Sequence, residues 1–289
     1  MYTRKNQRNL TSDQRTRFVK AVLEVKRLGR YDKYVSLHSR YFAADGESGL
    51  RVAHMAPTFF PWHRHFLIVF ERELQLIDPG VSIPYWDWTR DSSASSKLWA
   101  DDFMGGNGRS SDGQVMTGPF AYRNGGWPIV FGVTEERYLT RNLGRPDRPL
   151  KLPSAAELTG ALAIATYDTA PWNSSPHTQG FRNRIEGWTV SDKAGGYLHN
   201  RVHQWVGGHM IGASSPNDPV FWLHHAFIDL IWVRWQRQHR TSRYLPDRPL
   251  GAKDPQHGRV ISSNEPMPPF GVKPSAVFDH RHYYQYEEN

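Results

Sequence analysis

Apolar residues recur with the period of an amphipathic helix in two long stretches of this sequence, residues 59–77 and 218–239. In both stretches the apolar face follows the spacing i, i+4, i+7 and i+11, and one histidine stands on it. The two stripes are His63, Leu67, Phe70 and Leu74, and Phe221, His225, Ile228 and Trp232. We therefore predict two long helices that each bury an imidazole, with Pro61 opening the first and Asp218 capping the second.

Shorter helical patterns occur in four further segments, which span residues 11–28, 32–42, 153–165 and 197–206. Thr11 or Ser12 can cap the first of these, and Ser154 with Glu157 makes a capping box at the third. Residues 83–150 are rich in Gly, Pro, Asn and Asp with little periodicity, so we expect long loops and a few short strands there. The predicted fold class is mainly α.

The amino-acid composition limits the metal sites and nucleophiles that the chain can form. The chain has no cysteine, fourteen histidines, eleven tryptophans and a formal net charge of +8. Without cysteine, disulfides, iron–sulfur clusters, thiolate-bound haem and a cysteine nucleophile are excluded, so any metal must be held by nitrogen or oxygen. The lysines and arginines are dispersed, which indicates a solvated basic surface and no nucleic-acid partner.

The chain is expected to form a single domain over residues 1–289, because no low-complexity linker or internal repeat divides it. No apolar run approaches the roughly eighteen residues of a membrane span, so we expect no membrane partner. The opening residues MYTRKNQRNLTSDQR lack the apolar centre of a signal peptide. We therefore expect no export signal in the chain itself.

Five histidines on the predicted helices face inward, and a sixth, His54, stands in the loop just before the helix of His63. The five are His38, His63, His199, His203 and His225. His199 and His203 are four residues apart, so one helix face can bring both rings to one ion. A single inward histidine is usually a hydrogen-bonded core residue, but six together would leave ring nitrogens unpaired at about 1–3 kcal/mol each. They form an early and a late set of three, which predicts two metal ions between facing helices.

Imidazole donors without a neighbouring carboxylate motif leave copper and zinc as candidate metals. Zinc would indicate a hydrolase or hydratase, although a catalytic zinc usually needs only one such set. Two matched sets of neutral donors favour a pair of copper ions.

Several motifs follow one another along the chain: PWHRHFLIVFE, IPYWDW, FRNRIEGW, LHNRVHQWVGG and NDPVFWLHHAFID. On these motifs the chain resembles the type 3 copper proteins, specifically the bacterial tyrosinases of the Streptomyces kind, over nearly its whole length. The resemblance implies a tyrosinase-like four-helix bundle that holds a dicopper centre. In the doublet His224–His225 it makes the second residue the ligand. It assigns three ligands to each copper ion: His38, His54 and His63 to the first, and His199, His203 and His225 to the second.

The activity that the resemblance implies is oxidation of phenols with dioxygen, by ortho-hydroxylation of monophenols and oxidation of o-diphenols to o-quinones. Glu186 and Asn200 match the pair that in this family orders a water as the base for the phenolic proton. Taken alone, Glu186 could instead pair with Arg182 or Arg184. Residues expected to line the substrate entrance are Trp188, Gly212, Ala213 and Ser214.

Alternatives remain open at this point. Gln204 and His209 depart from the usual pattern near the expected entrance, so an o-aminophenol oxidase that forms quinone imines or nitroso products is a second candidate. A haemocyanin-like oxygen carrier is the non-enzymatic alternative. The resemblance also implies a small copper-delivery partner, called a caddie protein. The chain is then expected to be cytoplasmic, or secreted in complex with that partner.

Overall fold

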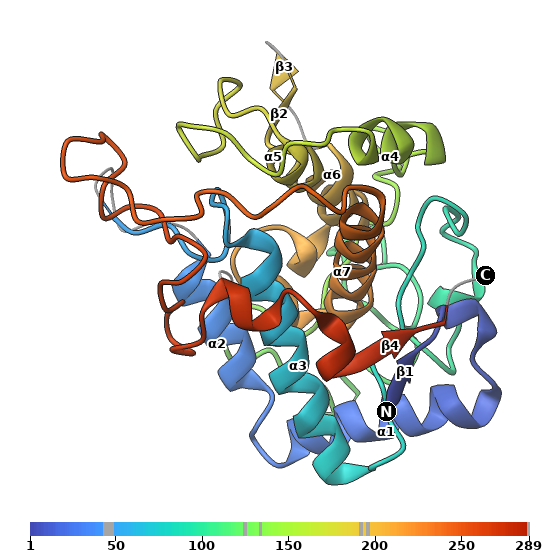
Figure 1. The fold of residues 1–289 in the computed structure, drawn as a ribbon. Helices are drawn as coiled ribbons and strands as arrows, with labels where there is room; N and C mark the ends of the chain where they lie inside the picture. The colour runs from blue at the N-terminus through green and yellow to red at the C-terminus, as the bar shows by residue number, and fades with distance from the viewer. Residues whose placement is uncertain (43–48, 124–125, 133–134, 191–192, 195–196, 288–289) are drawn as a thin grey trace.

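The computed structural model describes residues 1–289 except 43–48, 124–125, 133–134, 191–192, 195–196 and 288–289. The α-helices of these residues (Figure 1) are α1 Ser12–Arg27, α2 Asp32–Tyr41, α3 Phe59–Ile77, α4 Ala155–Leu162, α5 Phe181–Glu186, α6 Leu198–Val206 and α7 Val220–Gln238. The 3-10 helices are η1 Gln7–Asn9, η2 Lys97–Trp99, η3 Gly208–Met210, η4 Ser215–Asn217, η5 Pro274–Val277 and η6 His280–His282. The mainly helical prediction is confirmed.

The strands are short. β1 (Tyr2–Arg4) pairs in parallel with β4 (Tyr284–Tyr286), with Tyr2 opposite Tyr284, and so joins the two ends of the chain. β2 (Thr189–Val190) pairs antiparallel with β3 (Lys193–Ala194). None of the helices that the structure describes is long and apolar enough to cross a membrane.

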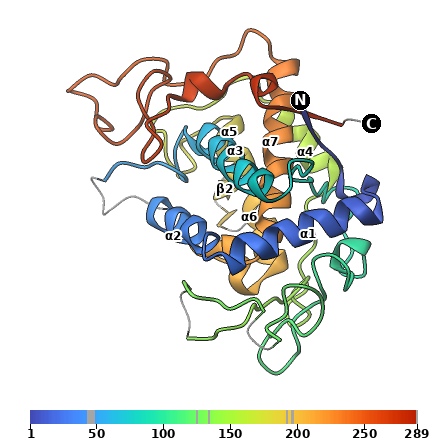
Figure 2. The ribbon, with the colours of Figure 1, turned by 90° about the horizontal axis from the view of Figure 1, so that it is seen from below.

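The site is built between four helices, α2, α3, α6 and α7. α3 and α7 pack against each other at the centre, and α1 packs across α3 (Figures 1 and 2). Figure 2 shows α2 on one side of α3 and the long loops that follow residue 100 on the side of α1 away from α3. The expected bundle is therefore present, and one contiguous hydrophobic cluster fills the space between its helices.

The two central helices are tied together by a buried ion pair. Nε of Arg64 on α3 donates to Asp229 on α7 at 2.6 Å, and neither side chain is more than 2 % exposed. The hydroxyls of Tyr284 and Tyr286 on β4 donate to the other oxygen of Asp229, at 2.5 and 2.7 Å. Since an unpaired buried charge is strongly destabilising, this network fixes how α3 and α7 pack and holds the C-terminal strand on them.

Most helix ends agree with the sequence predictions. Thr11 caps α1, and Ser154 and Glu157 form the predicted capping box of α4. α3 begins two residues before Pro61, which is compatible with proline because the first turn of a helix needs no backbone N–H. The short helix α5 was not predicted, since its six residues are too few to show a periodic pattern.

Candidate metal centre

The early histidines meet as one group. His38 on α2, His54 in the loop before α3 and His63 on α3 have ligand atoms within 4.8 Å of one another. Nδ1 of His38 donates to the carbonyl of Ala213 at 2.6 Å, and Nδ1 of His63 donates to the carbonyl of Phe59 at 2.8 Å. Each Nε2 is then the unprotonated nitrogen, and both are buried without a partner. The group thus presents inward lone pairs that a cation would satisfy.

The late histidines converge more closely. Nδ1 of His203 donates to the carbonyl of Met210 at 2.7 Å, and Nδ1 of His199 donates to Oδ1 of Asn200 at 2.9 Å. Their Nε2 atoms lie 3.0 Å apart, and each is 3.3 Å from Nε2 of His225 on α7. Two unprotonated nitrogens cannot hydrogen-bond to each other, so these short distances bring lone pairs together. Metal coordination is the interaction that fits this arrangement.

The two groups adjoin. The rings of His63 and His225 are stacked with centroids 4.4 Å apart, and the rings of His54 and His199 are 6.0 Å apart. Burial lowers the pKa of all six imidazoles, to about 3 for His38 and to about 4 for His203. The rings are therefore neutral near pH 7, which is the form that binds a metal. Neutral nitrogen donors of this kind suit copper or zinc.

A seventh histidine, His224, also lies within reach of the late group. The indole N–H of Trp88 donates to Nδ1 of His224 at 3.2 Å, so Nε2 of His224 carries the proton and has no lone pair for a metal. This tautomer supports the prediction that His225 is the ligand of the doublet and His224 a core residue.

Glu186, at the end of α5, contacts His199 of the late group and Met55, the residue after His54 of the early group. Its Oε1 accepts from the backbone N–H of Met55 at 2.6 Å and from the indole N–H of Trp188 at 2.7 Å. Its Oε2 accepts from Arg182 at 2.8 Å. Its backbone carbonyl lies 3.3 Å from Nδ1 of His199. Since Met55 directly follows His54, this one residue anchors the chain beside a histidine of each group.

Arg182 holds Glu186 within a buried charge network. The guanidinium donates twice to Asp168, at 2.8 and 3.1 Å, and once to Glu186, and all three side chains are fully buried. Burial raises the pKa of Asp168 to about 6 and also raises the pKa of Glu186, while the charge of Arg182 opposes both shifts. The ion pair considered for Glu186 from sequence alone is therefore present, and it is made with Arg182.

Gly187 ends α5 and redirects the chain past the site. Its φ is +86°, in the left-handed region, and a Cβ at this position would lie 1.9 Å from the carbonyl oxygen of Tyr197. Only glycine fits both constraints. This turn brings the indole N–H of Trp188 to the carboxylate of Glu186, to which it donates at 2.7 Å.

A cavity of about 360 Å³ opens above the late group. Of the four residues predicted for the substrate entrance, Trp188 and Gly212 line it, as does Asn200, which was predicted to hold the catalytic water. Ala213 and Ser214 do not, because Ala213 turns its carbonyl to His38 and Ser214 is buried. The residues lining the cavity are Phe42, His54, Trp188, His199, Asn200, His203, Gln204, Ile211, Gly212 and Ser215.

Phe42 and Ile211 were missed as cavity residues. Phe42 follows His38 by four residues, so helical spacing alone could have placed both rings on one side of α2. Ile211 is 52 % exposed, which is unusual for a large apolar side chain, and it stands in the loop expected at the entrance. Of the two departures from the family pattern, Gln204 lines the cavity, whereas His209 is buried and its Nδ1 accepts from the N–H of Thr140.

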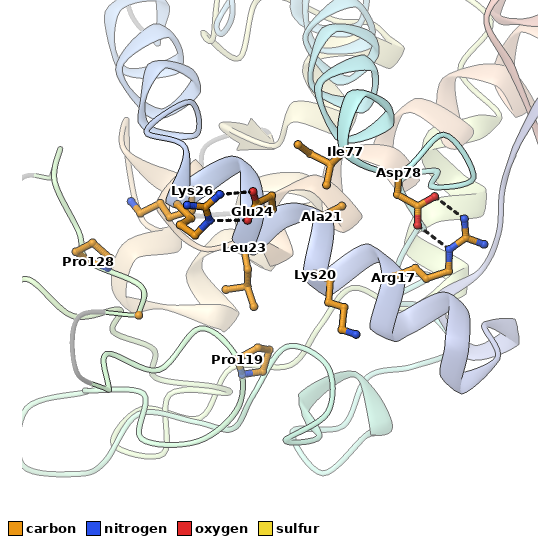
Figure 3. Close-up of a pocket in the computed structure, with 12 residues that line it drawn as sticks. Arg17, Lys20, Ala21, Leu23, Glu24, Lys26, Ile77, Asp78, Pro119 and Pro128 are labelled. Atoms are coloured by element: carbon orange, nitrogen blue, oxygen red, sulfur yellow. Dashed lines mark hydrogen bonds and ion pairs between the residues drawn. The ribbon is translucent and has the colours of Figure 1, made fainter.

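A larger cavity, of about 960 Å³, lies elsewhere, between α1, the end of α3 and a wall that includes Pro119, Gly126 and Pro128. Figure 3 shows its walls, on which Arg17 pairs with Asp78. Glu24, also on the wall, accepts from Arg27. The cavity has no histidine among its lining residues. It is therefore a groove separate from the candidate metal centre.

Comparison with known proteins gives three relevant similarities. Residues 28–238 match the common central domain of tyrosinase. A tyrosinase of Streptomyces antibioticus is 50% identical over 99% of this chain and 100% of its own length, and the grixazone synthase of Streptomyces griseus is 42% identical over the full length of both. The polyphenol oxidase of Thermothelomyces thermophila has a TM-score of 0.69 at 21% identity, covering 100% of this chain and 89% of that one. That last likeness shows the fold.

Proposed function

Because the chain belongs to the tyrosinase family, we propose that it oxidises phenols with dioxygen at a pair of copper ions. One observation carries this proposal: six neutral imidazoles lie in two adjoining groups beneath an open cavity, and those of His38, His63, His199 and His203 turn unprotonated nitrogens inward. We assign His38, His54 and His63 to one ion and His199, His203 and His225 to the other. When bound, copper supplies the exchange of electrons with dioxygen.

The protein's own residues hold the centre and receive the substrate. Backbone carbonyls of Ala213, Phe59 and Met210 fix three of the rings, so that the ligand nitrogens do not need to reorganise. A phenol ring enters through the cavity between Trp188 and Ile211, where it meets apolar surface and the amide of Asn200. Gln204 offers a second amide, and the described lining residues include no formally charged side chain.

A phenol with a pKa near 10 must lose its proton before it coordinates a metal well, so a base is needed. We assign this role to Glu186 acting through a water held by Asn200. Three of the roughly four acceptor positions of the Glu186 carboxylate are taken by Met55, Trp188 and Arg182, which leaves one for that water. The raised pKa of the buried Glu186 makes it a stronger base than an exposed glutamate.

The E186Q variant tests the assignment. Hydroxylation of a monophenol should slow at least tenfold more than oxidation of catechol, because catechol loses its proton more readily. Copper content must be measured in parallel, since Glu186 also anchors the residue after His54. Equal slowing on both substrates at full copper content would remove Glu186 from the role of base.

The similarity to grixazone synthase favours a second candidate, oxidation of o-aminophenols. Assaying tyrosine, catechol and an o-aminophenol side by side on the copper-loaded protein separates the two activities. Turnover of none of them, together with reversible oxygen binding, would instead support an oxygen carrier.

We also propose a small copper-delivery protein of the caddie type as partner, with the chain cytoplasmic or exported in complex with it. Burial of five of the six histidines supports this, because among the described residues three of the histidines, His54, His199 and His203, line an open cavity through which an ion can reach the centre. Co-expression with a candidate neighbour should raise copper content towards two ions per chain. Full loading by free copper alone at the same rate would contradict the proposed need for a partner.

A further inference from the structure

A second cavity, of about 420 Å³, lies between the C-terminal half of α7 and residues 242–264, the segment that follows α7 in Figure 1. We propose that it binds an aromatic carboxylic acid. Its volume is within the range of small-molecule sites, roughly 300–1,000 Å³. It shares no lining residue with the cavity over the metal centre.

The floor of this cavity is aromatic. Ring centroids of neighbouring floor residues lie 5.0 to 6.1 Å apart, which is the range of favourable ring contacts. The hydroxyls of Tyr167 and Tyr244 and the indole N–H of Trp235 donate to backbone carbonyls, so these polar groups are satisfied within the protein. Four of these rings are at most 4 % exposed, so the apolar surface open to a flat ligand is mainly that of the partly exposed Phe278. The floor residues are Tyr167, Trp232, Trp235, Tyr244 and Phe278.

The rim carries an excess of hydrogen-bond donors. Arg243 and Arg248 are exposed, and neither has a hydrogen-bond or ion-pair partner in the part of the chain that the structure describes. Oδ1 of Asn264 accepts from Ser275, which leaves its amide N–H₂ free to donate. Asp247 is the one carboxylate on the rim, so the formal charge of the lining residues is +1.

Floor and rim together define the ligand class. The planar guanidinium matches a carboxylate with two parallel hydrogen bonds, and a flat ring can pack on Phe278 at the floor. An aromatic acid satisfies both ends at once. A neutral aromatic would gain only the floor, and a small anion only the rim.

The bound acid would not obstruct the metal centre. Trp235 stacks on Phe181 at 4.9 Å, and Trp232 stacks on Phe60 at 5.4 Å. Phe60 in turn contacts Phe59, whose ring is 5.0 Å from that of His63. Layers of packed rings therefore separate the two cavities, and both can be occupied in one molecule.

Calorimetric titration of the copper-loaded protein with 3-phenylpropanoate tests this proposal, because that acid has no phenol group to be oxidised. R243Q/R248Q should weaken its binding at least fivefold and leave binding of the neutral 3-phenylpropanamide unchanged. R137Q/R240Q is the matched control, since it removes the same charge from two exposed arginines that do not line the cavity. It should change the affinity less than twofold.

Catechol oxidation measured with the same acid present tells which of the two cavities the acid occupies. If the acid also inhibits at the metal centre, the inhibition constant of R243Q/R248Q should differ less than twofold from that of the wild type. Undetectable binding at millimolar acid, unchanged affinity in R243Q/R248Q, or equal weakening in R137Q/R240Q would each overturn the proposal. A parallel loss of inhibition would do the same, because it would place the bound acid over the metal centre.

Discussion

Replacing Arg182 by methionine removes the charge at the centre of the network that holds Glu186 and keeps a side chain of similar length. Arg182, Asp168 and Glu186 are fully buried, and the guanidinium makes two hydrogen bonds to Asp168 and one to Glu186. In the variant Asp168 keeps one donor, the backbone N–H of Thr169 at 3.0 Å. Two buried carboxylates then lack their countercharge.

The free energy of unfolding at pH 7 should fall by about 3–5 kcal/mol, which is the loss when one partner of a buried ion pair is removed. The loss cannot greatly exceed this range, because Asp168 can take up a proton instead of staying charged. Keeping an aspartic acid neutral at pH 7 costs about 4 kcal/mol. Glu186 contributes less to the loss, since it keeps the N–H groups of Met55 and Trp188.

The pH dependence gives the prediction a second test. Without Arg182, the pKa of Asp168 rises beyond its present value of about 6. A carboxyl whose pKa is raised by folding stabilises the fold while it is protonated and loses that contribution as the pH rises through its folded pKa. The difference between variant and wild type should therefore shrink as the pH falls from 8 towards 6, by about 1.4 kcal/mol per pH unit for each proton taken up.

Urea unfolding of the copper-free proteins at pH 8, 7 and 6 measures this difference without a contribution from metal binding. Arg184→Met is the matched control on the same helix, and a change within about 0.5 kcal/mol is expected because Arg184 is outside the network. Equal losses for the two variants, or a difference that does not change with pH, would refute the reasoning.

Three further predictions concern single positions. His63→Ala should lower the copper content from two ions to about one per chain in a metal analysis, and retention of both would contradict its assignment as a ligand. Burial lowers the pKa of His280 to about 4, so below about pH 6.5 the unfolded chain gains a proton that the folded one excludes, and stability falls down to about pH 4. His280→Gln should reduce this fall by up to about 1.4 kcal/mol per pH unit in urea unfolding, and identical slopes would contradict it. Gly187→Ala should lower the free energy of unfolding by more than about 1 kcal/mol. Gly160→Ala should not lower it, because Gly160 lies in a helix with nothing near the new Cβ. Similar stabilities of the two variants in calorimetry would show that the turn at Gly187 is not needed.

The helices and most of the histidine set could be predicted from the sequence because their signals are local. The stripe of His63 and that of His225 each repeat within one helix, and the pair His199 and His203 is fixed by one helical turn. Capping at Thr11 is equally local. Such patterns need only the geometry of a single element, which the backbone imposes wherever the helix forms.

The assignment of His54 as a ligand and the role of His224 needed more than periodicity. His54 stands in a loop, so no helical spacing places it, and its assignment to one copper ion rested on a resemblance to a known family. The tautomer of His224 depends on Trp88, which is 136 residues away in the chain. No local pattern contains that hydrogen bond.

The sequence by itself determined the helical class and the exclusion of sulfur ligands, and it predicted six histidines as nitrogen donors. Only the tertiary structure decided which group each polar side chain faces: Glu186 joins Met55 and Arg182, and Ala213 turns its carbonyl to His38 instead of lining the cavity. The physical reason is that helix formation depends on neighbours a few residues apart, whereas a buried charge or ring nitrogen is satisfied by whichever distant segment the packing brings within 3 Å of it.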